Sequence, residues 1–279
     1  METVAHPPET LEGWYVLHQV YTVSRSRLRE LAAGDPAQLT HGAEALAAMT
    51  SGQAAEGGWS MVVELVGSMA DVMIVHFRPT LDALGVAQRQ LAALAVMEGL
   101  TPAYSFLSVT EAGMYHLTAQ LAREAEARGG AVGDEAYRAA MAERLASERD
   151  GPYVTRRLYP PMPDDKPYVC FYPMSKRRQT GQNWYTLSLE DRSRLMQAHG
   201  AVGRRYAGRV VQVIAGAIGL DAWEWGVTLF AADPLEFKKI VTEMRFDEAS
   251  ALYGEFGAFY VGKRVEARAW LGGLASRGV

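Results

Sequence analysis

The fold is decided by three runs in the second half of the chain: YVCFY (168–172), VVQVI (210–214) and WEWGVTLF (223–230). Aromatic and β-branched residues fill these runs, which favours buried strands. A helix is predicted over 188–206, between the first two runs, and another over 234–244, after the third. With a last strand at 258–261, the order is strand, helix, strand, strand, helix, strand, which is the ferredoxin-like plan.

The first half of the chain repeats this order. Strands are predicted at 14–21, 61–65, 71–77 and 103–109. Helices are predicted over 26–50, with an interruption at Gly34-Asp35-Pro36, and again from Leu81 onward, where apolar residues recur near helical spacing. The repetition lies in the order of elements rather than in residue identity. We therefore expect an α+β protein made of two ferredoxin-like repeats.

The connection between the repeats differs from both in composition. Residues 118–150 are rich in Ala, Glu and Arg, which favours two helices broken at Gly129-Gly130. Prolines favour an extended linker over 156–163. The chain is thus expected to divide into a flexible N-terminus (1–12), an N-terminal repeat (13–117), a helical connection and linker (118–166) and a C-terminal repeat (167–279).

Composition excludes several classes of protein. Of the 279 residues, 49% are hydrophobic and 22% are charged, the balance of a globular chain with a core. The net charge of -4 argues against a general nucleic-acid binder, which needs a basic surface. Cys170 has no second cysteine to pair with, and neither a secretory signal nor an apolar run of membrane-spanning length is present. We expect a soluble, cytoplasmic protein.

Motifs of several common chemistries are absent. The GxSxG elbow of acyl hydrolases, the phosphate loop of NTPases and the GxGxxG fingerprint of dinucleotide binders do not occur. The six histidines form no HxxxH or HxH pair, so a zinc site built from several histidines has no local support.

Residues 172–212 carry an unusual local charge. They hold eight cations against Glu190 and Asp191, a net +6 in a chain of net charge -4. Fixed cations attract and orient carboxylates, so the segment suits a small polyanionic ligand. A solvated basic face is the alternative.

His199 lies inside this basic segment. Ser188, with Asp191 three positions later, resembles a capping box that starts the helix. Gly200 and Gly203 flank the histidine, although glycine in a helix costs about 1 kcal/mol relative to alanine. Close approach of a flat ligand would compensate that cost, and a single imidazole beside such a shelf suits a haem-iron ligand. A hydrogen-bonded core histidine is the alternative.

Two further residues have both a structural and a functional interpretation. Tyr172 ends an apolar strand, where it either packs its ring with a solvated hydroxyl or takes part in redox or proton transfer. Gln212 interrupts the apolar run at 210–214, and a buried amide needs a fixed partner or faces a ligand cavity. Trp223-Glu224-Trp225 is more typical of core.

A set of motifs resembles the coproheme decarboxylase branch of the chlorite dismutase superfamily. The motifs are CFYPMSKRR (170–178), NWY (183–185), LMQAHG (195–200), GR (203–204), YAG (206–208), WEWGVTLF (223–230) and EMRFDEAS (243–250). The match is dense over 151–265 and looser but collinear over 12–117. Its motif set is specific.

The resemblance implies a dimeric α+β barrel, a porphyrin site in the C-terminal repeat alone and a ring of five subunits. It also implies roles for eight residues: His199 as iron ligand, Tyr172 as the radical-forming tyrosine, Lys176 beside the reacting propionate, Gln212 as the distal glutamine, Met174 as pocket lining, and Arg157, Arg204 and Ser250 as propionate contacts. One extra residue before Tyr172 leaves Arg156 as an alternative to Arg157.

The implied activity is oxidative decarboxylation of two propionates of iron coproporphyrin III to vinyl groups, giving haem b (protohaem), with hydrogen peroxide as oxidant, in haem biosynthesis. Transient contact with the coproporphyrin ferrochelatase is implied too. Chlorite-splitting members carry arginine where Gln212 stands, and actinobacterial members lack the Met-Ser-Lys-Arg run, so the chain is similar to the non-actinobacterial type. A chlorite dismutase-like haem peroxidase and a non-catalytic haem carrier remain as alternatives.

Overall fold

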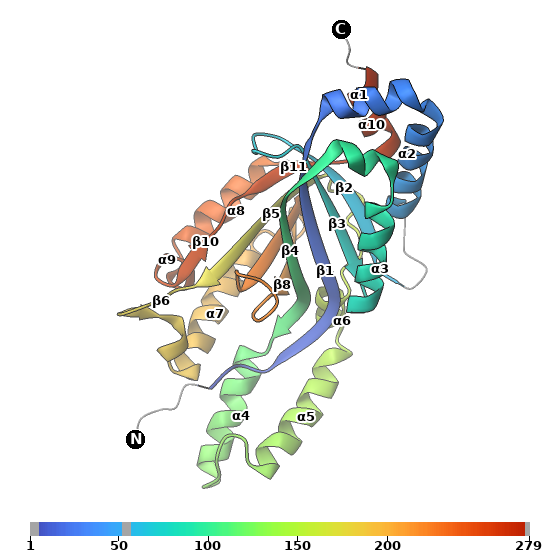
Figure 1. Ribbon diagram of the computed structural model, residues 1–279. Helices are drawn as coiled ribbons and strands as arrows, with labels where there is room; N and C mark the ends of the chain where they lie inside the picture. The colour runs from blue at the N-terminus through green and yellow to red at the C-terminus, as the bar shows by residue number, and fades with distance from the viewer. Residues whose placement is uncertain (1–5, 52–56, 277–279) are drawn as a thin grey trace.

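Nine strands of the described residues form one closed antiparallel sheet (Figure 1). The computed structural model describes residues 6–51 and 57–276. The strand order is β10-β5-β11-β2-β3-β1-β4-β8-β9, and pairing of β5 with β9 closes the barrel. The strands are β1 (Thr10–Val23), β2 (Trp59–Leu65), β3 (Val72–Arg78), β4 (Leu100–Gly113), β5 (Tyr168–Lys176), β8 (Val210–Gly216), β9 (Trp225–Ala231), β10 (Gly254–Phe256) and β11 (Tyr260–Val265); β6 (Arg178–Gln179) and β7 (Gln182–Asn183) form a separate small hairpin.

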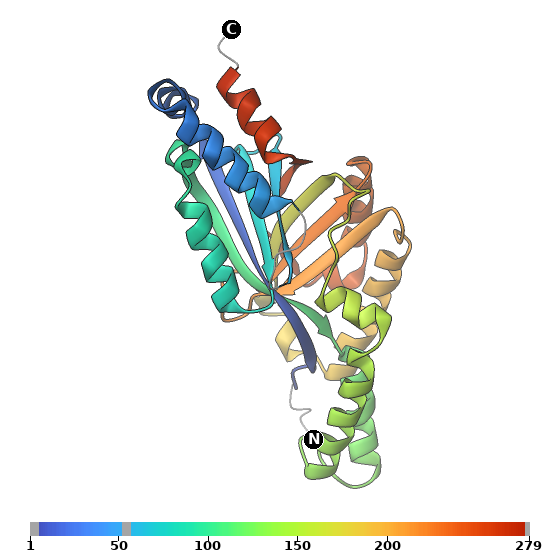
Figure 2. The ribbon, with the colours of Figure 1, turned by 90° about the vertical axis from the view of Figure 1, so that its right-hand side faces the viewer.

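The helices lie outside the sheet in two groups on opposite sides (Figure 2). The first group contains α1 (Arg25–Gly34), α2 (Pro36–Thr50), α3 (Leu81–Ala92) and α10 (Ala267–Ser276), and the second α7 (Leu189–Arg204), α8 (Leu235–Arg245) and α9 (Glu248–Ala251). A hairpin of α4 (Tyr115–Ala127) and α5 (Glu135–Arg149) projects from one end of the barrel, followed by α6 (Pro152–Leu158). Short 3-10 turns are η1 (Ala95–Gly99) and η2 (Trp184–Thr186). Over the described ranges, no helix combines the length and apolar character that crossing a membrane requires.

Each half of the barrel has the predicted order of elements. The first is β1, α1 and α2, β2, β3, α3 and β4; the second is β5, α7, β8, β9, α8 and β11. The halves join where β4 pairs with β8 and where β2 pairs with β11. The prediction of an α+β fold with two ferredoxin-like repeats is confirmed.

Alternation along β5 divides its side chains between two cores. Val169 and Phe171 pack inside the barrel with residues of both halves, such as Phe106. Cys170 and Tyr172 belong to a second apolar layer, which includes buried residues of α8 and the residues just after α7. Because side chains on a strand alternate between faces, the sequence itself places Tyr172 on the side of these helices.

Two sequence predictions are wrong in detail. Strand β1 already begins at Thr10, where its first residues pair with the end of β4, so the N-terminal lead-in is shorter than residues 1–12; residues 1–5 lie outside the described part. Residues 156–158 are helical rather than an extended linker. Pro152 is compatible with a first helical turn, and burial of Val154 and Leu158 in one apolar cluster stabilises α6.

Candidate active site

Strand pairing gathers three of the predicted residues on one face of the sheet. Tyr172 and Met174 lie on β5 and Gln212 lies on β8, with β9 between them. The pairs across β9 are Tyr172 with Val227, Met174 with Trp225 and Gln212 with Leu229. Paired residues project to the same side of a sheet, so all three predicted residues face the side on which α7 and α8 lie.

Tyr172 is held in an aromatic cluster. Only 9% of its surface is exposed. Its ring stacks on that of Phe259 with the centroids 4.4 Å apart, and lies 6.0 Å from that of Phe256. Burial raises the pKa of the Tyr172 phenol far above its usual value; Cys170 adds to this effect and Arg245 opposes it. The phenol therefore keeps its proton at neutral pH.

Lys176 ends β5 and is also buried. Its Nζ donates to the carbonyl oxygen of Ala249 at 3.1 Å and lies 4.2 Å from the centroid of a Trp184 ring. Desolvation lowers the pKa of Lys176 to about 8, although Asp247 and Glu224 favour its charged form. A lysine with a lowered pKa can exchange its proton near neutral pH.

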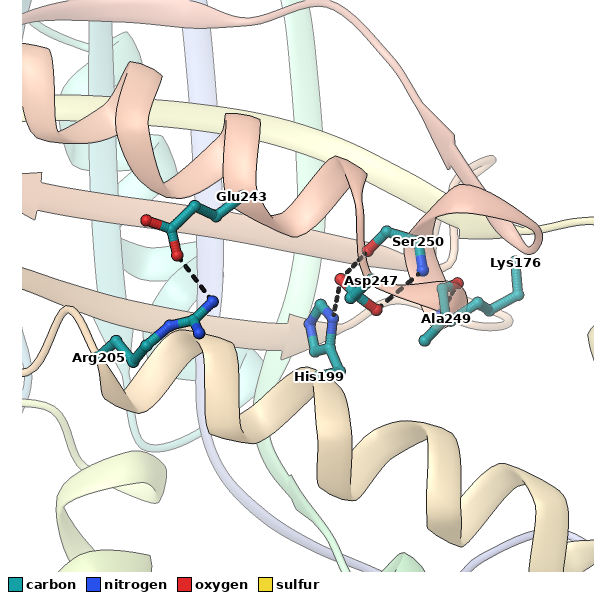
Figure 3. A network of polar contacts seen from close by, with 7 residues as sticks. All are labelled: Lys176, His199, Arg205, Glu243, Asp247, Ala249 and Ser250. Atoms are coloured by element: carbon teal, nitrogen blue, oxygen red, sulfur yellow. Dashed lines mark hydrogen bonds and ion pairs between the residues drawn. The ribbon is translucent and has the colours of Figure 1, made fainter.

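His199 on α7 is oriented by a carboxylate. Its Nδ1 lies 3.0 Å from Oδ2 of Asp247 (Figure 3). Because a carboxylate only accepts hydrogen bonds, Nδ1 carries a hydrogen, and in the neutral imidazole the lone pair is then on Nε2. The His199 side chain is 31% exposed and that of Asp247 only 6%. A fixed tautomer with a free Nε2 is the usual arrangement of a metal-binding histidine with its supporting carboxylate.

The same carboxylate starts α9. The backbone N–H of Ser250 donates to Oδ1 of Asp247 at 3.2 Å, and the Ser250 hydroxyl donates to Oδ2 at 2.9 Å (Figure 3). Burial alone would raise the pKa of Asp247, but the hydrogen bonds from His199 and Ser250 outweigh it and hold the pKa below its usual value. Asp247 is thus ionised. The predicted propionate contact, Ser250, has its hydroxyl hydrogen directed at Asp247.

The two helix glycines approach neighbouring side chains closely. A Cβ on Gly203 would lie 3.2 Å from Nε2 of Gln212 and 3.3 Å from Cε of Met244, so α7 lies over β8 at this point. A Cβ on Gly200 would lie 3.2 Å from a guanidinium nitrogen of Arg204, which is exposed. Ser188 caps α7 as predicted, accepting from the backbone N–H of Asp191.

Arg157 lies on α6, apart from the residues just described. It is half-buried, whereas Arg156 is exposed. Its guanidinium donates to the hydroxyl of Tyr153 at 3.3 Å. Burial raises the pKa of Glu111 on β4, and the charge of Arg157 is among the effects that oppose this shift.

The basic segment 172–212 is less positive in the folded chain than its sequence indicates. Four of its eight cations form ion pairs with acids that follow the segment: Arg178 with Glu224 (4.0 Å), Arg194 with Glu248 (3.4 Å), Arg205 with Glu243 (2.8 Å) and Arg209 with Glu236 (2.8 Å). Of the others, Arg192 is buried and donates to the carbonyl oxygen of His6, and Lys176 is buried as described. Acids from outside the segment therefore offset four of its six net positive charges.

The donor set fits an iron porphyrin better than a bare metal ion. In the part of the chain that the structure describes, three or more His, Cys, Asp or Glu side chains nowhere gather as a metal site. A haem iron needs a single axial histidine, since the macrocycle supplies the other ligands. His199, with its Nδ1 held by Asp247, meets that need. A separate hollow of about 650 Å³ lies elsewhere, between α2, β2 and the start of α10.

Sequence reasoning missed three residues of this site. Asp247 was inside a quoted motif, and an Asp three positions before Ser250 is a helix-capping signal, but the signal does not show which histidine the carboxylate reaches. Glu224 accepts from the backbone N–H of Lys176 at 2.7 Å. Trp184, stacked beneath Lys176, also lay in a quoted motif.

The comparisons with known proteins agree on the family. The family model described as chlorite dismutase matches residues 38–265. A protein of Thermus thermophilus named coproheme decarboxylase is 41% identical over 280 residues, covering 96% of this chain and 98% of its own. One of the same name from Staphylococcus carnosus is 40% identical over 255 residues, covering 91% and 92%. A solved haem-binding protein from Thermus thermophilus superposes with a TM-score of 0.79 at 40% identity, covering 96% of this chain and 99% of that one.

Proposed function

Because the chain belongs to the chlorite dismutase family, we propose that it converts two propionates of iron coproporphyrin III to vinyl groups by oxidative decarboxylation, giving protohaem with hydrogen peroxide as oxidant. Relatives named coproheme decarboxylase, matched over nearly the whole chain, support this activity. The observation that carries it is a buried tyrosine on the sheet face toward α7, together with a histidine on α7 whose Nδ1 is held by a carboxylate. Gln212, in place of the arginine of chlorite-splitting members, disfavours chlorite decomposition.

We propose that the porphyrin lies between α7 and the sheet face that carries Tyr172. His199 would bind its iron through Nε2, with Asp247 holding the imidazole. Met174 would line the pocket. When bound, the iron porphyrin and peroxide together supply the two oxidising equivalents that each decarboxylation needs.

The propionates are assigned to cations and one hydroxyl. Arg157 and Arg204 would bind carboxylates by charge-assisted hydrogen bonds, for which the planar guanidinium is suited. Ser250 would donate to a carboxylate only after its hydroxyl turns away from Asp247, since it has a single hydrogen to give. Its contact is therefore made on binding.

Tyr172 performs the step that the protein itself contributes. Its phenol gives up one electron and its proton, and the resulting phenoxyl takes a hydrogen atom from the β-carbon of a propionate, which restores the phenol. Loss of CO2 and of a second electron leaves the vinyl group. In total, one propionic acid group and one hydrogen peroxide become one vinyl group, CO2 and two waters.

Lys176 and Gln212 complete the site. The Lys176 ammonium would orient the reacting carboxylate, and its pKa of about 8 lets it give or take a proton during the reaction. Gln212 offers peroxide a neutral amide rather than a cation. A neutral partner exerts a weaker field on a developing anion, so general peroxidase activity is expected to be poor.

The proposal also covers the number of subunits, the location in the cell and the partner protein. We propose a homopentamer in the cytoplasm, with the porphyrin bound by the C-terminal repeat (167–279) and with transient contact to the coproporphyrin ferrochelatase. The family resemblance supports each point. Native mass spectrometry of the purified protein tests the subunit number.

A haem carrier is separated from an enzyme by two measurements. An enzyme of this kind binds iron coproporphyrin III more tightly than protohaem and consumes peroxide in proportion to the vinyl groups formed. A carrier would bind protohaem at least as tightly and would consume no peroxide. Absorbance titration with each porphyrin, followed by a peroxide assay, decides between them.

A further inference from the structure

We propose that Glu111, which belongs to the N-terminal half, is a positioning residue of the porphyrin site in the C-terminal half. It fixes the indole of Trp225 as part of the wall against which the porphyrin ring lies. The inference rests on the proposed function, because it takes the face of Tyr172 and Gln212 as the porphyrin-binding face.

Trp225 stands on that face. It is the first residue of β9, and it pairs with Met174 on β5 and with Gly216 on β8. Tyr172 lies two residues before Met174, so alternation puts Trp225 and Tyr172 on the same side. The Trp225 side chain is half-buried. A half-buried indole on this face offers a flat apolar surface to a flat ligand.

Glu111 reaches Trp225 from the other half of the barrel. The pairing of β4 with β8 joins Val109 to Gly216 and Thr110 to Ala215, and Glu111 is the next residue of β4. Its Oε1 accepts from Nε1 of Trp225 at 2.7 Å. Since a partly buried indole N–H needs an acceptor, this contact sets the plane of the ring.

Gly216 makes the contact sterically possible. A Cβ at this position would lie 2.2 Å from Oε2 of Glu111 and 2.8 Å from its carboxyl carbon. The carboxyl group therefore lies directly over the backbone of Gly216, and any larger residue would displace it. Position 216 consequently provides a second, independent way to break the contact with Trp225.

The surroundings of Glu111 connect it to the substrate end of the site. Burial raises the pKa of Glu111, the Trp225 hydrogen bond lowers it, Glu12 raises it and Arg157 lowers it. Arg157, the proposed propionate ligand, is thus near enough to act on the carboxyl group.

The test compares porphyrin affinity across a small set of variants. Glu111→Ala and Gly216→Ala should each weaken binding of iron coproporphyrin III roughly tenfold, as expected for loss of one hydrogen bond involving a charged group. Glu111→Gln, whose amide oxygen can still accept from the indole, should stay within about twofold of wild type. Glu12→Ala is the matched control, because Glu12 is exposed and lies across the β1–β4 pair from Glu111.

A double variant distinguishes positioning from a direct contact with the ligand. In a Trp225→Phe background, which has no indole N–H, Glu111→Ala should have no further effect on affinity. An additive loss would overturn the proposal. Protohaem should lose affinity in Glu111→Ala by the same factor as iron coproporphyrin III, because both present the same ring; a loss confined to coproporphyrin would instead place Glu111 on the carboxylates.

A measurement without porphyrin tests the anchor itself. In protein labelled with fluorotryptophan, the Trp225 fluorine resonance is the one missing from Trp225→Phe. It should shift or broaden in Glu111→Ala and Gly216→Ala and stay in place in Glu12→Ala. A purely structural tie between β4 and β9 would lower the melting temperature of Glu111→Ala and leave the porphyrin affinity unchanged, which would contradict the proposal.

Failure of this inference and failure of the proposed function are distinguishable. If the wild type binds iron coproporphyrin III but releases no CO2 with peroxide, the proposed activity is wrong. The porphyrin affinities of the variants still test the positioning role of Glu111 in that case. If the wild type decarboxylates and Glu111→Ala binds normally, only the role of Glu111 is wrong. Should Glu111→Ala fail to fold, the affinity of Gly216→Ala, which breaks the contact, is compared with that of Glu111→Gln, which keeps it.

Discussion

The amide Nε2 of Gln212 lies 3.2 Å from the point where a Cβ of Gly203 would stand. This relationship ties the helix that carries His199 to the strand that carries Gln212, the proposed distal residue. It also explains a glycine in the last turn of α7, since alanine favours a helix by up to about 1 kcal/mol relative to glycine.

Gly203→Ala should therefore separate stability from activity. The added methyl must displace the ends of Gln212 and Met244 by a few tenths of an ångström, while helix propensity improves. We expect an unchanged or higher melting temperature and a slower peroxide-dependent reaction. Gly273→Ala on α10, where a Cβ meets open space, should leave the rate unchanged. A Gly203→Ala enzyme with the wild-type rate would remove Gln212 from the reaction.

Asp247→Asn should weaken the hold of His199 on iron. The amide can still accept from Nδ1 but carries no charge, so the imidazole becomes a poorer donor; such changes next to metal ligands cost roughly 10- to 100-fold in affinity or activity. The iron–histidine stretching frequency, read by resonance Raman spectroscopy, should fall. Asp233→Asn is the control, since Asp233 accepts from the backbone at the start of α8. An unchanged frequency in Asp247→Asn would contradict the assignment of His199.

Tyr172→Phe should bind iron coproporphyrin III nearly as well as wild type and form no vinyl groups. The ring contacts with Phe259 and Phe256 persist, and only the hydroxyl that carries the transferable hydrogen is lost. Tyr168→Phe, four residues earlier on the same face of β5, should remain active. Chromatography of the extracted porphyrins measures the vinyl groups. Vinyl formation by Tyr172→Phe would rule out the radical role.

Binding of the tetracarboxylate substrate should depend on pH through Lys176. Its pKa of about 8 in the free protein is lower than that of an ordinary lysine, chiefly through desolvation. A bound carboxylate favours the ammonium form and raises this pKa, so binding takes up a proton above about pH 8. Affinity should thus be level below pH 8 and fall as pH rises above it.

The matched variant for this pH dependence is Lys176→Met. It should bind more weakly at low pH and show no fall above pH 8. Absorbance titrations on both sides of that pH measure the two profiles. A wild-type affinity that does not change between pH values below and above 8 would show that Lys176 does not face a propionate.

Much of the fold follows from local sequence. Ser188 marks the start of α7 because its side chain caps the helix, and two-residue alternation in YVCFY assigns Tyr172 to the helix side. Local sequence already made His199 a candidate iron ligand, with a core histidine as the alternative, whereas the role of Lys176 came from the resemblance alone. What local sequence could not give is contact between distant segments. Asp247 meets His199 across 48 residues, and the acids that pair with the basic segment all come from later in the chain.

The error over residues 156–158 has a related cause. Prolines at 160, 161 and 163 dominated the prediction of an extended linker. Burial of Leu158 against Leu11 and Ala112 is tertiary, and it stabilises a short helix that local propensity does not specify.

The central claim is tested most directly by adding hydrogen peroxide in steps to the protein loaded with iron coproporphyrin III and weighing the porphyrin by mass spectrometry. The account predicts two successive losses, each of CO2 plus two hydrogens, ending at protohaem. Bleaching of the porphyrin without these losses would contradict it.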